Sequence, residues 1–398
     1  MSEFKAAFSA ACGTGMIDIE GPTAKYTDEV FDQNALPKGL SVAILMNPFH
    51  DSEMERFLHN YFIPKKNSQI FIDSGGYQLI RGIFKGDKTE FKEKVYNLMA
   101  KYADYAFCFD ENPLDKNRVY CHERVIPAVL ETNKNIKRQI EVFKEKGSKA
   151  KVLPIFQIKE DDRHKVIDLL FDGVNLEYIA GIALNKLVWG GNGTEDFGKL
   201  AFFNEVKKAV KIPNMLHLLS YGLLRVVTPF IILQRFGYFG EDNIFSADSS
   251  LYVQGMRRWG WVPLLDGSGH RVAGAENPTA WAAFKEYAIH RIPELKDRIE
   301  KMEHTNTRTD HPTANLLSTC FMMVAKNAYI NLFSDPVSFA LKYQYLTEAQ
   351  ITSLKELSRT NTFQDYQKWR EDFGVLWNDR RALLNSKEGV KNTLDAFF

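Results

Sequence analysis

The sequence predicts an α/β fold, a (β/α)8 TIM barrel with an insertion after the last strand and a helical C-terminal extension. Three observations lead to this prediction. Eight short aliphatic or β-branched runs recur along the chain, segments with helical spacing of apolar residues lie between them, and the repeat stops after the eighth run. Strands that alternate with helices form parallel sheets, and eight such units favour a closed barrel over an open sheet.

The predicted strands share a short length and a high content of aliphatic residues. In chain order they are Phe4–Phe8, Leu40–Met46, Ile70–Asp73, Tyr105–Asp110, Lys151–Gln157, Tyr178–Leu184, Met215–Leu219 and Asn243–Asp248. The segment from Val125 to Phe143 places its apolar residues at helical spacing and predicts an amphipathic helix between two strands.

The chain changes character after the eighth strand. Residues 1–335 are predicted to form the barrel, including an insertion at 266–312 that contains a helix around Trp281 and Phe284. The apolar segment Thr313–Phe333 is the expected closing helix, and residues 336–398 are expected to form a helical extension that packs on the barrel. No repeat of fixed period and no flexible linker divides the sequence, which favours one compact unit.

Composition limits the classes of function. The 398 residues are 45% hydrophobic and 25% charged, which is typical of a folded protein and excludes disorder and coiled coil. Because 51 basic residues face 50 acidic ones, a nucleic-acid partner would need a local basic patch. No apolar run is long enough to span a membrane, and four scattered cysteines indicate neither a disulfide framework nor a cysteine-rich metal site. A cytoplasmic protein is expected.

Polar residues follow several of the predicted strands. Asp73, Asp110, Gln157, Gly181 and Asp248 each lie where a strand is expected to end. A single carboxylate after a strand is more often a helix N-cap than a catalyst. Because all strands of a parallel barrel end on the same face, several such groups together predict an active site there.

These residues lie in motifs that resemble those of the tRNA-guanine transglycosylases, enzymes that exchange a guanine base for a 7-deazaguanine. Asp73-Ser-Gly-Gly-Tyr-Gln78 is similar to the signature of that family, and its two glycines allow the backbone to approach a flat ligand closely. Further elements match in the same order: Phe109–Pro113, Ile155–Gln157, Ala180–Ala183, Leu218–Gly222 and Phe245–Tyr252.

The resemblance implies a reaction. Asp248 matches the nucleophile of the family, which would attack the sugar and form a covalent aspartyl-glycosyl intermediate. Asp73 would be the general acid and base that protonates the leaving guanine and deprotonates the incoming base. No cofactor is expected.

The resemblance also implies how substrates bind. Asp110 and Gln157 would read the guanine edge, Gly181 would add a backbone contact, and Tyr77 and Leu219 would enclose the ring. Arg257 and Arg258, which lie beside Trp259 and Trp261, are the expected phosphate-binding residues.

The sequence departs from the family at its zinc site. The insertion lacks the family's cysteines, and Lys326-Asn327 stands where a His-Asn pair is expected, so no metal is predicted. His304, His311 and Cys320 are the only alternative ligands considered, and their spacing matches no standard site. The chain also leaves no room for the RNA-binding domains of archaeal members.

Both departures favour the relatives in phages and bacterial modification clusters that place 7-deazaguanines in DNA. The predicted partners are therefore DNA and a free 7-deazaguanine, with 7-cyano-7-deazaguanine as the expected base, in a host cytoplasm if the protein is phage-encoded. The target nucleotide would have to leave its helix.

Three alternatives remain open. The same exchange on tRNA would serve queuosine or archaeosine formation, a non-catalytic homologue would bind nucleic acid only, and a glycoside hydrolase would use the same carboxylates on a barrel. His217 lies inside an apolar strand and is predicted to be a hydrogen-bonded core residue.

Overall fold

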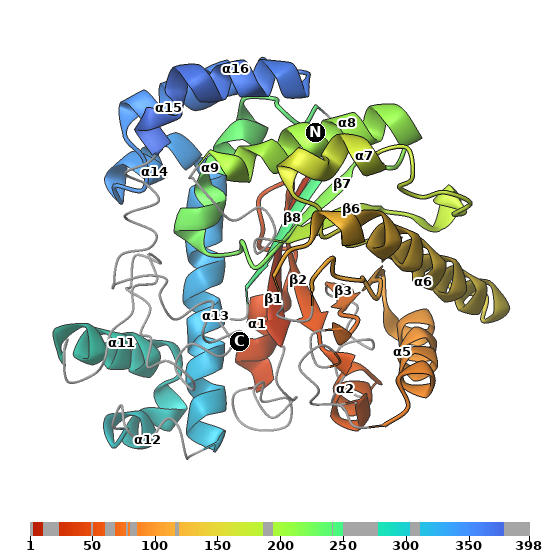
Figure 1. The fold of residues 1–398 in the computed structure, drawn as a ribbon. Helices are drawn as coiled ribbons and strands as arrows, with labels where there is room; N and C mark the ends of the chain where they lie inside the picture. Colours follow the sequence, from red (N-terminus) through yellow and green to blue (C-terminus); the bar gives the residue numbers. More distant parts are fainter. Residues whose placement is uncertain are drawn as a thin grey trace.

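Eight parallel strands with helices between them form a nearly closed barrel, which confirms the predicted fold class (Figure 1). The computed structural model describes residues 3–10, 24–48, 51–59, 68–76, 79, 86–115, 119–185, 194–240, 242–249, 278–302 and 311–377. The strands are β1 (Glu3–Ala10), β2 (Leu40–Met46), β3 (Gln69–Ile72), β4 (Tyr105–Phe107), β5 (Lys151–Leu153), β6 (Gly181–Asn185), β7 (Met215–Leu219) and β8 (Ile244–Ser249).

The α-helices lie between the strands and after the last strand. They are α1 (Ala24–Phe31), α2 (Asp51–Phe57), α5 (Lys88–Tyr102), α6 (Val125–Glu145), α7 (Arg163–Val166), α8 (Glu195–Val210), α9 (Leu224–Arg235), α11 (Pro278–Arg291), α12 (Lys296–Glu300), α13 (His311–Ser334), α14 (Pro336–Lys342), α15 (Glu348–Leu357) and α16 (Phe363–Phe373). The short 3-10 helices are His122–Arg124, Glu160–Asp162, Leu176–Tyr178 and Pro293–Leu295.

The strands lie in the order β5-β4-β3-β2-β1-β8-β7-β6, and the barrel closes between β5 and β6. Isolated bridges join Val152 to Ile179 and Ile155 to Ala183 across this seam. Pro154 lies between the two bridges and has no N–H to donate, although its carbonyl accepts the N–H of Ala183 at 2.7 Å. The seam is therefore an interrupted ladder.

Most predicted elements agree with the structure. The bounds of β2 and β7 are as predicted, and α6 buries the apolar face expected from Val125 to Phe143. β4 is shorter than predicted because Phe109 turns outward and packs edge-on against Phe91 and Tyr96 of α5. The helix expected around Trp281 is α11, and the closing helix is α13.

The barrel interior is built in layers from alternate residues of the strands. Lys5 of β1 is buried near the amino end, 2.6 Å from Glu3 and over the ring of Tyr105. In the next layer the rings of Phe71 and Phe107 lie 6.2 Å apart. Because side chains of a strand alternate between its faces, Asp73 continues the row of Phe71 towards the carboxyl end.

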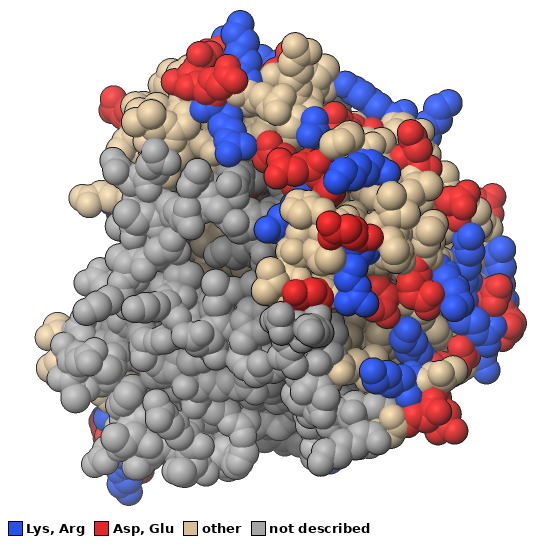
Figure 2. Space-filling model, in the orientation of Figure 1, with Lys and Arg blue, Asp and Glu red and all other residues tan. Residues whose placement is uncertain are grey.

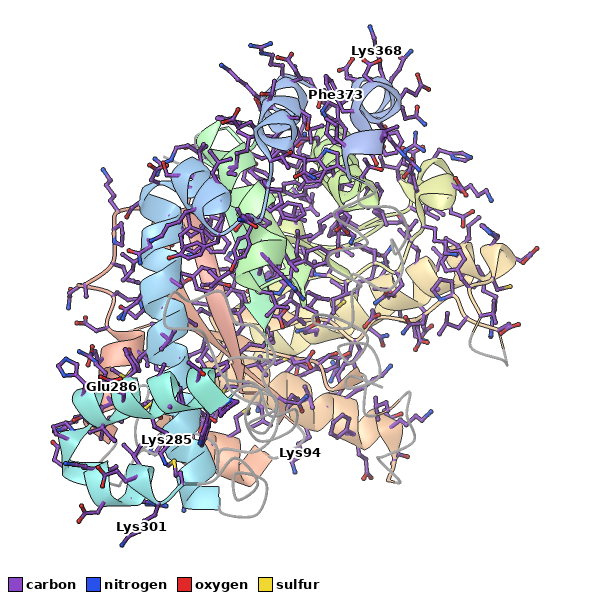
Figure 3. The ribbon with its side chains drawn as sticks, turned by 90° about the vertical axis from the view of Figure 1, so that its left-hand side faces the viewer. Lys94, Lys285, Glu286, Lys301, Lys368 and Phe373 are labelled. Carbon is purple, nitrogen blue, oxygen red and sulfur yellow. The ribbon has the colours of Figure 1, made fainter. Side chains whose placement is uncertain are left out.

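The C-terminal helices pack on α8 and α9 at one end of the molecule (Figure 1). The rings of Trp369 and Trp377 lie 5.4 and 4.8 Å from that of Phe197 in α8, and the Tyr366 hydroxyl donates to the Thr194 carbonyl at 3.0 Å. Figure 3 shows α16 far from α11 and α12. The helical prediction is thus confirmed to residue 377, and residues 378–398 lie outside the described part.

The sequence predicts that no segment spans a membrane and that no strong overall positive charge attracts nucleic acid. None of the helices in the described ranges is long and apolar enough to cross a membrane. Basic and acidic side chains intermingle over the described part of the face shown in Figure 2.

Gly181 is expected to be essential for the pairing of β6 with β7. A Cβ atom at this position would lie 1.8 Å from the carbonyl oxygen of Met215 in β7, so Gly181→Ala must push two paired strands apart. We expect a loss of at least about 3 kcal/mol in the free energy of unfolding, measured by urea denaturation. Gly147→Ala is the control, because φ is +61° there but no atom lies within 4 Å, and about 1 kcal/mol is expected. Equal losses in the two variants would contradict this account.

Candidate active site

Three aspartates lie at the carboxyl end of the barrel, where the sequence predicts the site. Asp73 follows β3, Asp110 follows β4, and Asp248 lies near the end of β8. Burial raises the pKa of Asp73 most, and the negative charges of Asp248 and Asp110 raise it further, so Asp73 is within electrostatic reach of both other carboxylates. Bringing like charges together costs free energy, and capping a helix does not require it. Such groups of carboxylates are typical of functional sites.

Asp73 is held between two loops. Its Oδ1 accepts the N–H of Ser74 at 2.8 Å, and its Oδ2 accepts the side-chain amide of Asn47 at 3.4 Å. Burial raises the pKa of Asp73 from 3.8 to about 7, and the N–H of Ser74 only partly opposes this. A carboxyl group with this pKa can give and take a proton near neutral pH. Asn47 was missed in the sequence, although it follows β2 as Asp73 follows β3.

Asp110, which is half-buried, and Gln157, which is buried, form a hydrogen-bonded pair. The Gln157 amide donates to Asp110 Oδ2 at 3.0 Å, and burial raises the pKa of Asp110 to about 6 against the effect of that hydrogen bond. Gln157 is 7% exposed, and its Oε1 has no hydrogen-bond partner in the described ranges. A buried acceptor without a partner costs free energy, so this oxygen is available for an N–H group of a ligand.

Helix α6 fixes the loop that carries Asp110. The side-chain amide of Asn135 donates to the carbonyl of Phe109 at 3.0 Å, and the N–H of Glu111 donates to Thr132 Oγ1 at 2.9 Å. Asp110 therefore lies between two backbone groups that a buried helix face holds in place.

The glycines after Asp73 let two loops meet. Gly75 has φ of +70°, and a Cβ atom there would lie 3.2 Å from the Phe91 ring. At Gly76 a Cβ atom would lie 3.2 Å from Ser74 Oγ and 3.8 Å from Asp110 Oδ1. The glycine pair thus lets the loop of Asp73 lie close to Phe91 and Asp110, and its predicted close approach to a flat ligand stays a prediction.

Asp248 is 6% exposed and is bound through one carboxylate oxygen. Oδ1 accepts the N–H of Ser220 at 2.7 Å and lies 3.2 Å from Nε2 of His217. Ser220 has φ of +66°, a left-handed conformation that aims its N–H at the carboxylate, and the N–H of Gly222 donates to the Asp248 carbonyl at 2.7 Å. The loop after β7 is therefore shaped around Asp248.

His217 is completely buried beneath Asp248. Its Nδ1 contacts Ser246 Oγ, and its ring centroid lies 4.8 Å from that of Phe107 and 5.7 Å from that of Phe71. The predicted hydrogen-bonded core position is confirmed, but its position beside Asp248 was not predicted. Pairing the predicted strands would have revealed it, because β7 and β8 place His217 opposite Ser246.

Two residues predicted to contact the base, Leu219 and Gly181, lie at opposite ends of their strands. Leu219 ends β7 opposite Asn185, at the carboxyl end of the barrel. Gly181 begins β6 opposite Met215, so the prediction that it follows a strand at the mouth is wrong. Tyr178, where the strand was predicted to begin, belongs to the 3-10 turn Leu176–Tyr178, and β6 runs from Gly181 to Asn185 instead of from Tyr178 to Leu184.

The remaining predicted site residues are not placed. Tyr77, Arg257 and Arg258 lie outside the described residues. The predicted residues that the structure brings to the carboxyl end are Asp73, Asp110, Gln157, Leu219 and Asp248.

Two cavities lie at opposite ends of the barrel. One of about 180 Å³ is lined by Asp110, Gly76 and the first turns of α5, including Lys88 and Lys92. A larger one of about 920 Å³ lies at the amino ends of the strands, beside Tyr105. Because parallel barrels carry their chemistry at the carboxyl end, the smaller cavity is the one that belongs to the site.

Lys326 occupies the position where the resemblance leads one to expect a metal-binding histidine. Its ammonium donates to the carbonyls of Glu29 and Asp32 at 2.6 and 2.8 Å, at the end of α1. A cation is favourable beside the carbonyls of a helix C-terminus. Among the described residues, no three histidine, cysteine, aspartate or glutamate side chains are grouped to hold a metal ion.

Comparison with known proteins adds no assignment. The chain matches no model of a protein family and no curated protein. The functional proposal therefore depends on the geometry of the carboxylates and on the motifs that hold them.

The raised pKa of Asp73 predicts a pH-dependent stability. Because its carboxyl takes up protons more readily folded than unfolded, its protonation stabilises the fold below about pH 4, and this stability is lost as the pH rises to about 7. Relative to wild type, Asp73→Asn should gain about 1–3 kcal/mol of stability between pH 4 and pH 8, measured by urea denaturation.

Asp110→Asn is the matched variant. Its gain in unfolding free energy relative to wild type should also be positive. This gain should be complete near pH 6, since the pKa of Asp110 is raised to about 6. If the unfolding free energies of wild type and both variants changed in parallel with pH, the raised pKa values of Asp73 and Asp110 would be contradicted.

Proposed function

We propose that this protein exchanges a guanine base in DNA for a 7-deazaguanine, with 7-cyano-7-deazaguanine as the incoming base. The observation that carries the proposal is the grouping of Asp73, Asp110 and Asp248 at the carboxyl end of the barrel, next to the unpaired acceptor of Gln157. These residues lie in the motifs that resemble those of the transglycosylases.

Asp248 is the nucleophile in this proposal. Its carboxylate attacks the anomeric carbon as the bond from that carbon to the guanine nitrogen breaks, and the electron pair of that bond leaves with the base. Asp73 gives its proton to the departing guanine, which its pKa of about 7 permits. The incoming base then loses its ring N–H proton to Asp73 and displaces Asp248 from the sugar.

The pocket chemistry matches a guanine-like edge. Gln157 offers a buried acceptor oxygen, and the Asp110 carboxylate accepts hydrogen bonds beside it. Guanine and its 7-deaza analogues carry an N–H and an amino group on one edge, so two adjacent acceptors suit them.

The choice of DNA over tRNA depends on the insertion. Residues 266–312 lack the cysteines of the zinc subdomain found in the tRNA enzymes, and Lys326 fastens α13 to α1 through carbonyl contacts. A duplex substrate would have to release the target nucleotide from its stack.

The proposal is tested by incubating the protein with guanine-labelled duplex DNA and free 7-cyano-7-deazaguanine. We expect release of labelled guanine and a modified deoxynucleoside in the digested DNA by mass spectrometry. A parallel reaction contains tRNA. Exchange in tRNA alone would overturn the choice of DNA, and binding without exchange in either would overturn the enzymatic proposal.

Asp248→Ala should reduce exchange by at least about 10³-fold, because no other group can hold the glycosyl intermediate. Asp172→Ala, which changes an exposed aspartate remote from the strand ends, is the control and should keep wild-type activity. Circular dichroism checks that both variants are folded. Retained exchange in folded Asp248→Ala would rule out Asp248 as the nucleophile.

A further inference from the structure

We infer that His217 is a positioning residue for Asp248, which it holds so that Oδ2 is the attacking oxygen. The inference rests on the proposed base exchange and adds to it the choice of oxygen and the residue that enforces it. Among the residues that the structure describes, the two hydrogen-bond donors to this carboxylate, the Ser220 N–H and His217 Nε2, both meet Oδ1.

The contacts of the imidazole define its tautomer. For Nε2 to donate to a carboxylate oxygen it must carry a proton, and a neutral ring then has an acceptor at Nδ1. Ser246 Oγ lies at Nδ1 and can donate its hydroxyl proton there. Ser246 and Asp248 are alternate residues of β8, so one strand face supplies both partners of the ring.

A role in packing alone does not account for this residue. The rings of Phe71 and Phe107 pack against His217, and a leucine or phenylalanine would suit such surroundings. A buried imidazole is costly unless both nitrogens are paired. Here both are paired, and one of the partners is the carboxylate to which we assign the nucleophilic role.

The same contact serves both halves of the proposed exchange. While Asp248 is free, the two donors fix the plane of its carboxylate and leave Oδ2 directed away from them. When Oδ2 is bonded to the sugar, Oδ1 becomes the ester carbonyl and still faces the Ser220 N–H and His217 Nε2. As the incoming base displaces Asp248, negative charge returns to Oδ1 and the two donors stabilise it. Loss of one donor should therefore slow cleavage of the intermediate.

Two substitutions distinguish the effect of the hydrogen bond that His217 donates from the effect of the space that its side chain fills. His217→Gln keeps an amide N–H near the position of Nε2, whereas His217→Leu fills the space without a donor. We expect kcat for base exchange to fall about 10²-fold in His217→Leu and less than about 10-fold in His217→Gln, with KM for the free base changed less than about 3-fold in both.

The covalent protein–DNA adduct provides the decisive measurement. Its steady-state fraction on denaturing gels should rise in His217→Leu and stay near wild type in His217→Gln. Equal kcat and adduct fractions in the two variants would overturn the inference, as would a parallel fall in both that follows their thermal stability.

Crystal structures of the two variants give a readout that does not need activity. The Asp248 carboxylate should turn in His217→Leu and keep its orientation in His217→Gln, and an unmoved carboxylate in both would overturn the inference. If wild type exchanges no base in DNA or tRNA, the proposed function fails, and the orientation of Asp248 in these crystals still decides whether His217 positions it.

Discussion

The grouping of three carboxylates at one end of a parallel barrel is the constraint on which the site depends. Burial and mutual repulsion make this arrangement costly, and burial is the largest cause of the raised pKa of both Asp73 and Asp110. The surrounding structure offsets the cost with donors: the Ser74 N–H at Asp73, the Gln157 amide at Asp110, and the Ser220 N–H at Asp248. Each donor comes from a loop that a helix or a neighbouring strand holds in place.

These contacts divide the mouth of the barrel into two sides. The loops after β3 and β5 bring Asp73, whose pKa is raised to about 7, and Gln157, whose Oε1 has no hydrogen-bond partner among the described residues. β7 and β8 bring a carboxylate with two donors on one oxygen. A planar base with an N–H edge suits the first side, and the sugar carbon to which it is bonded would meet the second. The arrangement is therefore suited to breaking a bond between a base and a sugar.

The fold and most of the site could be predicted from sequence because both follow from local patterns. Apolar runs define the strands, and the parallel direction of those strands brings Asp73, Asp110 and Asp248 together. Gly181 was misplaced because the run Tyr178–Ala180 was interpreted as strand, whereas Tyr178 ends a 3-10 turn and β6 begins only at Gly181. His217 was underestimated because its role depends on which β8 residues lie opposite it, and strand pairing is a property of the whole barrel.

The two sides of the site are connected in two ways around the barrel, and the connection across the interrupted seam between β5 and β6 has fewer backbone hydrogen bonds than the other. On the far side they are joined by the continuous ladders of β1 with β2 and β8. Across the seam they are joined by two isolated bridges on either side of Pro154. Thermal opening of this seam would move Gln157 away from β6 while Asp248 stays fixed by its own ladders. The distance between Gln157, on the proposed base-binding side, and Asp248, the proposed nucleophile, would thus depend on a few backbone hydrogen bonds across the seam.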